Sequence, residues 1–197
     1  MLIQYAYGKG FLPEMDHVNV FIAAFTTSNA RHRLYTTLEK LGDRVLYFDT
    51  DSVIYRYDTT KEEQYMPAIG DHLGQWTNEL NVGEHITRFV SSGPKSYGYF
   101  TNLGSSIMKM KGFNRNYEVC QKLNFESLIE LVLFWLNPIE HPLPSGREPY
   151  VELKFDKICR DKNKMIIFNR EEIKKFRVTY DKRYVIPGKY DTLPYGY

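Results

Sequence analysis

The stretch at positions 44–57 reads RVLYFDTDSVIYRY. It holds two runs rich in aliphatic and aromatic residues, 44–48 and 53–57, which are separated by a short break that contains Asp49 and Asp51. Strand-forming runs that are interrupted by turn-forming residues predict a β-hairpin. The two acids would then lie where the apolar runs end, at the tip of the hairpin and outside the sheet.

A helix is expected directly before this hairpin, over residues 18–41. Gly42 would end it, because glycine is common just beyond the C-terminus of a helix. Four aliphatic residues recur at helical spacing in this segment: Ala30, Leu34, Leu38 and Leu41. After the hairpin, residues 58–84 are rich in Gly, Asp and Thr, and an irregular connection is expected there.

The second half of the chain is expected to mix strands with one long helix. Strands are predicted over 96–101 and 106–113, and a helix is predicted from near Asn124 to just before Pro138. Residues 128–136 are apolar nearly all round the helix, so burial of most of its surface is expected. Three further strand-like runs follow a proline-rich linker: 151–155, 165–168 and 176–180. Strands, then a helix, then strands without regular alternation predict an α+β fold.

Charge is distributed unevenly along the 197 residues. Residues 1–149 hold 14 Lys and Arg against 17 Asp and Glu, whereas residues 150–197 hold 12 against 7. A basic C-terminal segment fits a polyanion partner, and a solvated charged surface is the alternative.

Cysteine usage and hydropathy indicate a soluble intracellular protein. The two cysteines, Cys120 and Cys159, lie far apart and have no metal-type spacing, so buried thiols in a reducing compartment are expected and not a disulfide. The five histidines are scattered and predict no zinc site. The longest apolar run, 128–136, is shorter than the roughly 20 residues that span a bilayer, and no membrane partner is expected.

Asp49 and Asp51 are the sharpest chemical feature. Two carboxylates that flank one small residue at a hairpin tip converge on a single point, and a hard divalent cation such as Mg²⁺ or Mn²⁺ takes oxygen ligands of this kind. A buried apolar strand, 45–48, would hold them in place. The alternative is a solvated Asp-rich turn, since Asp favours turns for its own backbone hydrogen bonds.

The longer string YFDTDS at 47–52 resembles the third catalytic motif of family B DNA polymerases, YxDTDS, at the tip of the palm hairpin. The resemblance implies that Asp51 is a direct ligand of a two-metal centre and that Asp49 supports that centre, both acting in catalysis. Tyr47, Thr50 and Ser52 would support the hairpin. In that family the two ions activate the primer 3′-hydroxyl and neutralise the triphosphate of the incoming dNTP.

Two later stretches resemble primer-gripping elements of the same family. GPKSYGY at 93–99 is similar to the KxY element and KMKGF at 109–113 to the KxKG element. Alternation along a strand would place Lys95, Tyr97 and Tyr99 on one face, and likewise Lys109 and Lys111. The resemblance implies that Lys95, Tyr97, Lys109 and Lys111 hold primer-template DNA without reading its sequence. The alternative is ordinary edge strands with polar residues outward.

Within the family, the chain is most similar to the protein-primed branch of Polinton/Maverick transposons, related viruses and linear plasmids. Three stretches carry this resemblance: IAAFTT at 22–27, RHRLY at 31–35 and LPYGY at 193–197. It implies the C-terminal part of a palm subdomain over residues 1–112 and a thumb-like subdomain over 113–197. It also implies a terminal protein as a possible primer.

Other motifs of the family are absent from the sequence. Neither a DxxSLYP-like motif, which supplies another metal-binding Asp, nor a KxxxNSxYG-like motif for the nucleotide occurs. The expectation is therefore a polymerase fragment that is inactive alone and completed by the remainder of the polymerase. Two alternatives stay open: a non-catalytic DNA-binding palm–thumb remnant, and a DxD metal-dependent glycosyltransferase.

Overall fold

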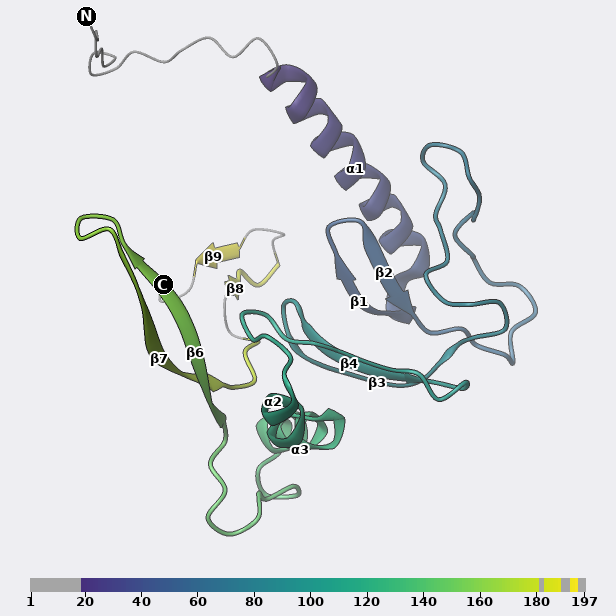
Figure 1. The fold of residues 1–197 in the computed structure, drawn as a ribbon. Helices are drawn as coiled ribbons and strands as arrows, with labels where there is room; N and C mark the ends of the chain where they lie inside the picture. Colours follow the sequence, from purple (N-terminus) through teal and green to yellow (C-terminus); the bar gives the residue numbers. More distant parts are fainter. Residues whose placement is uncertain (1–18, 181–182, 189–191, 195–197) are drawn as a thin grey trace, which may run out of the picture. The chain divides into compact units, whose positions relative to one another are not determined.

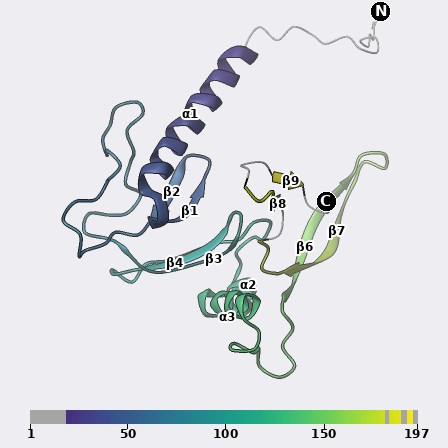
Figure 2. The ribbon, with the colours of Figure 1, turned by 180° about the vertical axis from the view of Figure 1, so that it is seen from behind.

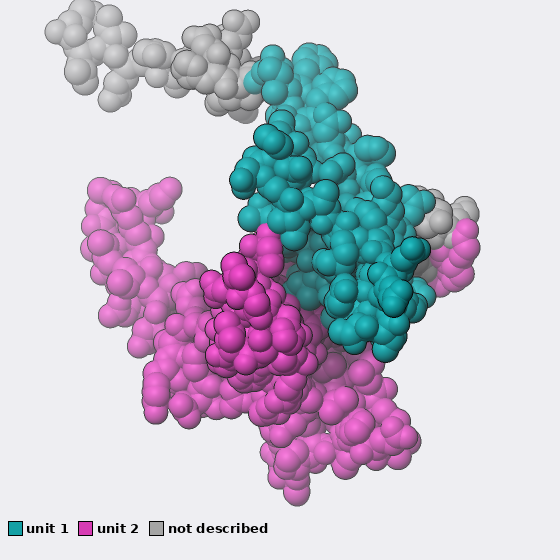
Figure 3. Space-filling model, turned by 90° about the vertical axis from the view of Figure 1, so that its right-hand side faces the viewer, with its two compact units in different colours: residues 1–77 teal, residues 78–197 magenta. Residues whose placement is uncertain are grey.

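The computed structural model describes residues 19–180, 183–188 and 192–194. The chain forms two compact units, Met1–Thr77 and Asn78–Tyr197 (Figure 3). The division falls inside the irregular connection after the first hairpin, whereas the sequence placed a boundary between residues 112 and 113. The helices that follow residue 112 share a core with the sheet that precedes it. The division into palm and thumb parts at residue 112 stays a prediction.

The first unit begins with helix α1, Val20–Leu41 (Figure 1). The Asn19 side chain accepts a hydrogen bond of 3.0 Å from the backbone N–H of Ile22 and so caps the first turn. Gly42 ends the helix with a φ of 54°, as its position in the sequence predicts. Only the last turns of α1 are buried, through Leu34, Thr37 and Leu41, and Ala30 is exposed.

The predicted hairpin follows a short 3₁₀ turn, Gly42–Arg44. Strand β1, Val45–Asp49, pairs antiparallel with β2, Ser52–Tyr55. The expectation that β1 is a buried apolar strand is wrong: Leu46 is 47% exposed and Phe48 is 49% exposed. A two-stranded ribbon has two faces, and within the described residues of this unit the second face is left open.

The second unit is built on a sheet of three antiparallel strands in the order β3-β4-β5. These strands are Ile86–Gly93, Ser96–Thr101 and Ser106–Lys109. The sequence predicted β4 and β5 but not β3. It also extended β5 to residue 113, whereas the strand ends at Lys109. Residues 58–84 form turns and one isolated bridge, in agreement with the expected irregular connection.

Two helices cover one face of this sheet: α2, Tyr117–Lys122, and α3, Phe125–Leu136. Helix α3 begins at the predicted Asn124, whose side chain accepts from the Ser127 N–H while the Ser127 hydroxyl accepts from the Asn124 N–H. This reciprocal capping box satisfies two N–H groups that have no partner within the helix. The short helix α2 was not predicted.

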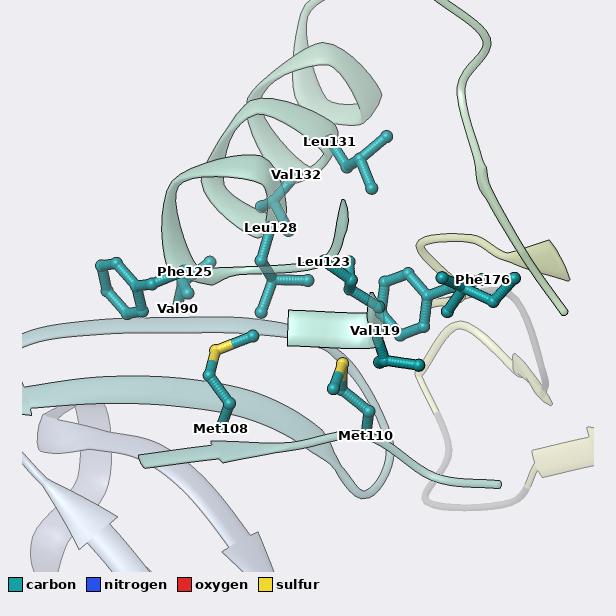
Figure 4. Packing of buried hydrophobic residues seen from close by; sticks show 11 residues of the cluster. Val90, Met108, Met110, Val119, Leu123, Phe125, Leu128, Leu131, Val132 and Phe176 are labelled. Carbon is teal, nitrogen blue, oxygen red and sulfur yellow. The ribbon is translucent and has the colours of Figure 1, made fainter. Parts of the chain in front are cut away.

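The core lies between these helices and the sheet (Figure 4). It is composed of aliphatic, methionine and phenylalanine side chains: Val90, Met108, Met110, Val119, Leu123, Phe125, Leu128, Leu131, Val132, Leu153 and Phe176. Each fully buried leucine contributes roughly 1.5–3 kcal/mol to folding. The expectation that most of the surface of α3 is buried is wrong, because Trp135 is 47% exposed and Leu136 is 63% exposed.

The chain continues into a long antiparallel ribbon of β6, Val151–Asp161, and β7, Ile166–Phe176. Figures 1 and 2 show the two strands running together away from α2 and α3. The sequence predicted three short strands here. Two of the predicted runs belong to these two strands of 11 residues each, and residues 177–180 lie outside any strand. A small ribbon of β8, Arg183–Val185, and β9, Thr192–Pro194, follows.

Helices combined with antiparallel sheets make this an α+β fold, as predicted. Within the described ranges, no helix combines the length and the apolar character needed to cross a bilayer.

Candidate functional site

The acidic tip of the first hairpin is held by its own hydroxyl groups. Asp49 is the last residue of β1 and lies opposite Ser52. The Thr50 hydroxyl donates to the Asp49 carboxylate over 3.1 Å, and the Ser52 hydroxyl donates to the Asp49 carbonyl over 3.1 Å. The Asp51 N–H also donates to that carbonyl over 2.6 Å. Thr50 and Ser52 therefore fix the backbone between the two acids.

Backbone strain is present at the same tip. Thr50 has a φ of 52°, in the left-handed region that β-branched residues rarely adopt. Such a conformation costs on the order of 1–3 kcal/mol, and it is found most often at functional sites. The two acids lie in different environments, because Asp49 is half-buried and Asp51 is exposed. Tyr47, two residues before Asp49, is also half-buried.

The described residues supply two carboxylates for a metal ion and no third ligand of the usual kinds. Nowhere among them do three or more His, Cys, Asp or Glu side chains lie together. Mg²⁺ is bound by one or two carboxylates, with waters and phosphate oxygens completing an octahedral shell. Asp49 and Asp51 thus fit one edge of a divalent cation site whose other ligands come from substrate, water or further protein.

The predicted primer-gripping residues gather in the second unit at one end of β4. Tyr97 and Tyr99 lie on one face of the strand, with their rings 6.4 Å apart and nearly parallel. Phe89, from the unpredicted strand β3, lies 6.2 Å from Tyr97 on that face. The sequence offered only a weak signal for Phe89, because polar residues interrupt the alternation along residues 86–92.

Lys109 joins this aromatic group from the neighbouring strand. It lies opposite Tyr97 in the β4–β5 register, and its ammonium nitrogen is 5.9 Å from the centre of the Tyr97 ring. The Tyr97 phenol, by its charge and by a hydrogen bond, raises the pKa of Lys109 above its ordinary value. Lys109 is therefore a cation at every physiological pH.

Lys95 and Lys111 are placed differently from the prediction. Lys95 does not share a strand face with Tyr97, because it lies in the turn before β4 with a φ of 59°. Lys111 lies beyond the end of β5, so it does not share a strand face with Lys109. Its backbone N–H donates to the Ser96 hydroxyl over 3.1 Å, which holds Lys111 beside the turn that carries Lys95. The three lysines and Tyr97 therefore still meet at one end of the sheet.

The opposite face of β4 is closed by α3. Phe125 meets Phe100 edge-to-face at 4.7 Å between ring centres. Gly98 permits this approach, since a side chain there would overlap Met108 and press on Phe125. The two faces of the sheet are thus distinct: one packs against the helices, and the other presents Tyr97, Tyr99 and Lys109.

The segment after β7 is hydrogen-bonded to the end of β3, next to the turn that carries Lys95. The Thr179 N–H donates to the Ser92 carbonyl over 2.9 Å, and the Tyr180 hydroxyl donates to the Ser91 carbonyl. Burial raises the pKa of Tyr180, whose ring lies 4.8 Å from that of Trp135. We call residues 177–180 the strap. The sequence predicts a strand over 176–180, whereas residues 177–180 lie outside any strand.

The two acids belong to the first unit, and the lysine–tyrosine cluster (Lys95, Tyr97, Lys109 and Lys111) belongs to the second. Comparisons with protein-family models, with curated proteins and with solved structures find no match for this chain.

Proposed function

We propose that this chain is part of a DNA-directed DNA polymerase of family B, with the first hairpin belonging to the palm and the later elements to a thumb. The observation that carries the proposal is the motif YFDTDS on an antiparallel hairpin with both acids at its tip. The strained turn at Thr50 and its hydroxyl contact to Asp49 support it, because they restrain the backbone of the tip and the Asp49 carboxylate, which a plain solvated turn would leave mobile.

In this proposal Asp51, which is exposed, binds the cations directly, and Asp49 orients the tip. Bound Mg²⁺ or Mn²⁺ supplies the charge that favours a primer 3′-alkoxide and neutralises the triphosphate of a dNTP. The Thr50 hydroxyl holds one Asp49 oxygen, so the carboxylate keeps one orientation.

The lysine–tyrosine cluster serves to hold the primer end. Three lysines bind backbone phosphates, and the Tyr97 phenol and its neighbour Tyr99 provide a flat surface for the terminal sugar. These residues would position the primer terminus in line for attack, which requires no recognition of the DNA sequence. A terminal protein that supplies the first hydroxyl group is part of the same proposal, which rests in part on residues 193–197. Of these, 195–197 lie outside the described residues.

A second candidate function has an observation in its favour. With two carboxylates and no further ligand cluster among the described residues, the chain fits a non-catalytic DNA-binding palm–thumb remnant as well. The glycosyltransferase alternative gains no support, since it requires a parallel nucleotide-binding sheet around the DxD motif. Among the described strands, β1 pairs only with antiparallel β2.

Affinity cleavage with Fe²⁺ tests the proposal. Fe²⁺ takes the place of Mg²⁺ and, with ascorbate and peroxide, cuts the protein backbone beside its binding site. In the presence of primer-template DNA and dNTP, we expect cuts near residues 48–52 that disappear in Asp51→Asn. They should persist in Asp71→Asn, which removes another exposed acid of the same unit. Cuts that are indifferent to Asp51→Asn, or absent from this segment, would refute the metal role of the hairpin.

A further inference from the structure

Strand β5 is an edge strand of the three-stranded sheet, and none of the described strands pairs with its outer side. At the connection from β4, the Thr101 N–H donates to the Ser105 carbonyl over 3.0 Å. Hydrogen-bonded pairs alternate along antiparallel strands, so the register places the backbone N–H and carbonyl groups of Ser106 and Met108 on the side away from β4. These two residues therefore offer backbone donors and acceptors to an added strand.

The Arg115 side chain lies along this outer side of β5. Its guanidinium group donates to the Met108 carbonyl over 3.5 Å, in agreement with a carbonyl that points away from β4. This distance is at the outer limit for a hydrogen bond, so the contact is weak. A backbone N–H of an added strand can replace it with a hydrogen bond of ordinary length.

A cavity opens beside the same edge, on the side of the sheet that the helices cover. Its volume is about 270 Å³, and Ser106, Met108 and Arg115 line it. Apolar side chains of β4, the α2–α3 junction and α3 also line it: Phe100, Leu123 and Phe125. A cavity of about 150 Å³ holds a benzene molecule, so this one admits a phenylalanine ring.

The charge around the cavity is positive on balance. Glu126 lines the cavity, but it is paired with Arg88 at 2.9 Å. Arg115 forms no ion pair with any residue in the described part of the chain. Residues 106–117 contain three cations and no acid. A partner with acidic side chains is therefore complementary to this edge.

We infer that the outer edge of β5 binds an extended acidic segment of a partner protein. The segment would pair antiparallel with β5, as β4 does on the other side, and would satisfy the outward backbone groups of Ser106 and Met108. A residue opposite Met108 carries its side chain on the helix-covered face, so a large apolar side chain there enters the cavity. An acid two residues away along the segment lies on that same face and can pair with Arg115.

The chemistry of the edge favours a polypeptide over a nucleic acid. The edge presents both N–H donors and carbonyl acceptors, and a polypeptide backbone matches both. Phosphate groups accept hydrogen bonds but donate none, so they would leave the carbonyls of Ser106 and Met108 without donors. This surface goes beyond the proposed polymerase role, because it needs neither a metal ion nor DNA.

The test measures binding of a fluorescein-labelled peptide to the whole 197-residue chain by fluorescence anisotropy. The peptide has a central phenylalanine, a valine on each side of it and a glutamate at each end. Alternation along a strand places the phenylalanine and both glutamates on one face. In the antiparallel arrangement, the phenylalanine N–H bonds to β5 and the valine N–H groups point away from it.

Changes to the peptide leave the protein intact and test the arrangement directly. N-methylation of the phenylalanine should weaken binding at least about tenfold, because it removes a donor and blocks the edge. N-methylation of the first valine is the matched control and should change affinity by less than about threefold. Replacing the phenylalanine by alanine should weaken binding roughly 30-fold, because the cavity is then left unfilled.

Changes to the protein test the edge from the other side. Ser106→Pro removes an outward N–H and leaves the pairing with β4 in place, since the outer side of an edge strand tolerates proline. It should weaken binding at least about tenfold, whereas Ser106→Ala should bind like the wild-type chain. Arg115→Gln should weaken binding about threefold. Lys122→Gln is its control and should leave binding unchanged, because Lys122 is already paired with Glu118.

Failure of the wild-type chain to bind the peptide at millimolar concentration would overturn the inference. Equal losses for the two N-methylated peptides would overturn it as well, and that comparison does not depend on the folding of any variant. Without peptide binding, dimerisation that Ser106→Pro abolishes would assign the edge to a second copy of this chain. Without peptide binding, Arg115-dependent binding of oligodeoxythymidylate would assign it to nucleic acid.

Discussion

At the scale of single residues, Gly93 carries the junction between the strap and the turn before β4. Its φ of 130° is open to glycine alone, and a Cβ atom there would overlap the carbonyl oxygen of Thr179. No other residue fits without moving the strap, which is hydrogen-bonded to Ser92. The position of Lys95 thus depends on the absence of a side chain two residues earlier.

Gly93→Ala is expected to lower the free energy of unfolding by about 2–4 kcal/mol, from backbone strain together with the steric overlap. Gly104→Ala is the matched control, because Gly104 also has a positive φ, of 82°, but open space where the Cβ would lie. That variant should lose only about 1 kcal/mol. Urea denaturation of both variants measures the difference. Equal losses of unfolding free energy would show that the strap moves away from the new side chain at no cost.

At the scale of elements, the β3-β4-β5 sheet is joined to the preceding connection by Glu84. This carboxylate is 9% exposed and accepts hydrogen bonds from Asn81, the shorter one 2.6 Å long. The Thr101 side chain at the end of β4 lowers the pKa of Glu84 most, followed by the Asn81 groups. Glu84 thereby stabilises the start of the sheet while it is ionised.

A carboxyl whose pKa is depressed in the folded state stabilises the fold above its ordinary pKa, here 4.5. That contribution is lost as pH falls below this value and through the lower folded pKa. Glu84→Gln should therefore be less stable than the wild-type chain at pH 7 and lose less stability on acidification. Thermal melts from pH 7 to pH 3 check this, with the exposed Glu79→Gln as control. Parallel acid curves for the wild-type chain and Glu84→Gln would contradict it.

The elements that the sequence predicted are those with strong local signals. Helix α1 ends at Gly42, helix α3 starts at the Asn124 cap, and the first hairpin has two dense apolar runs. Strand β3 depends on pairing with β4, and its polar residues hide the alternation. Helix α2, with six residues, is too short for periodicity to reveal.

The strand positions of the candidate lysines could be predicted only in part. Lys95 and Lys111 lie in turns and not on the expected strand faces, and their role in holding DNA stays a prediction. The alternation of side chains along a strand does not predict where the strand ends. That depends on hydrogen bonds such as the one from the Lys111 N–H to the Ser96 hydroxyl. The strap was beyond prediction, since it contacts residues nearly 90 positions earlier.

At the scale of the whole molecule, the proposed polymerase activity depends on how many carboxylates are present to bind metal ions. The described residues offer Asp49 and Asp51 without a further ligand cluster, whereas two-metal transfer needs ligands on both sides of the ions. In the proposed polymerase, the remaining ligands would come from protein beyond the described residues.

The isolated chain is therefore expected to bind primer-template DNA and to add no nucleotide to it. Primer extension with radiolabelled dNTP and Mg²⁺ or Mn²⁺ measures this directly. Asp51→Asn is the control for contamination, since a contaminating polymerase would be unaffected by it. Extension by the wild-type chain that Asp51→Asn lacks would contradict the expected incompleteness.

Three described hairpins turn on a residue that bears a side chain in the left-handed conformation: Thr50, Lys95 and Met165. Glycine or asparagine would adopt that conformation more readily. Replacing all three residues with glycine is expected to raise the free energy of unfolding by roughly 1 kcal/mol at each position. The same exchange would remove a hydroxyl, an ammonium and a thioether from the three hairpin tips. Thermal tolerance therefore competes with the proposed roles of Thr50 and Lys95 at these hairpin tips.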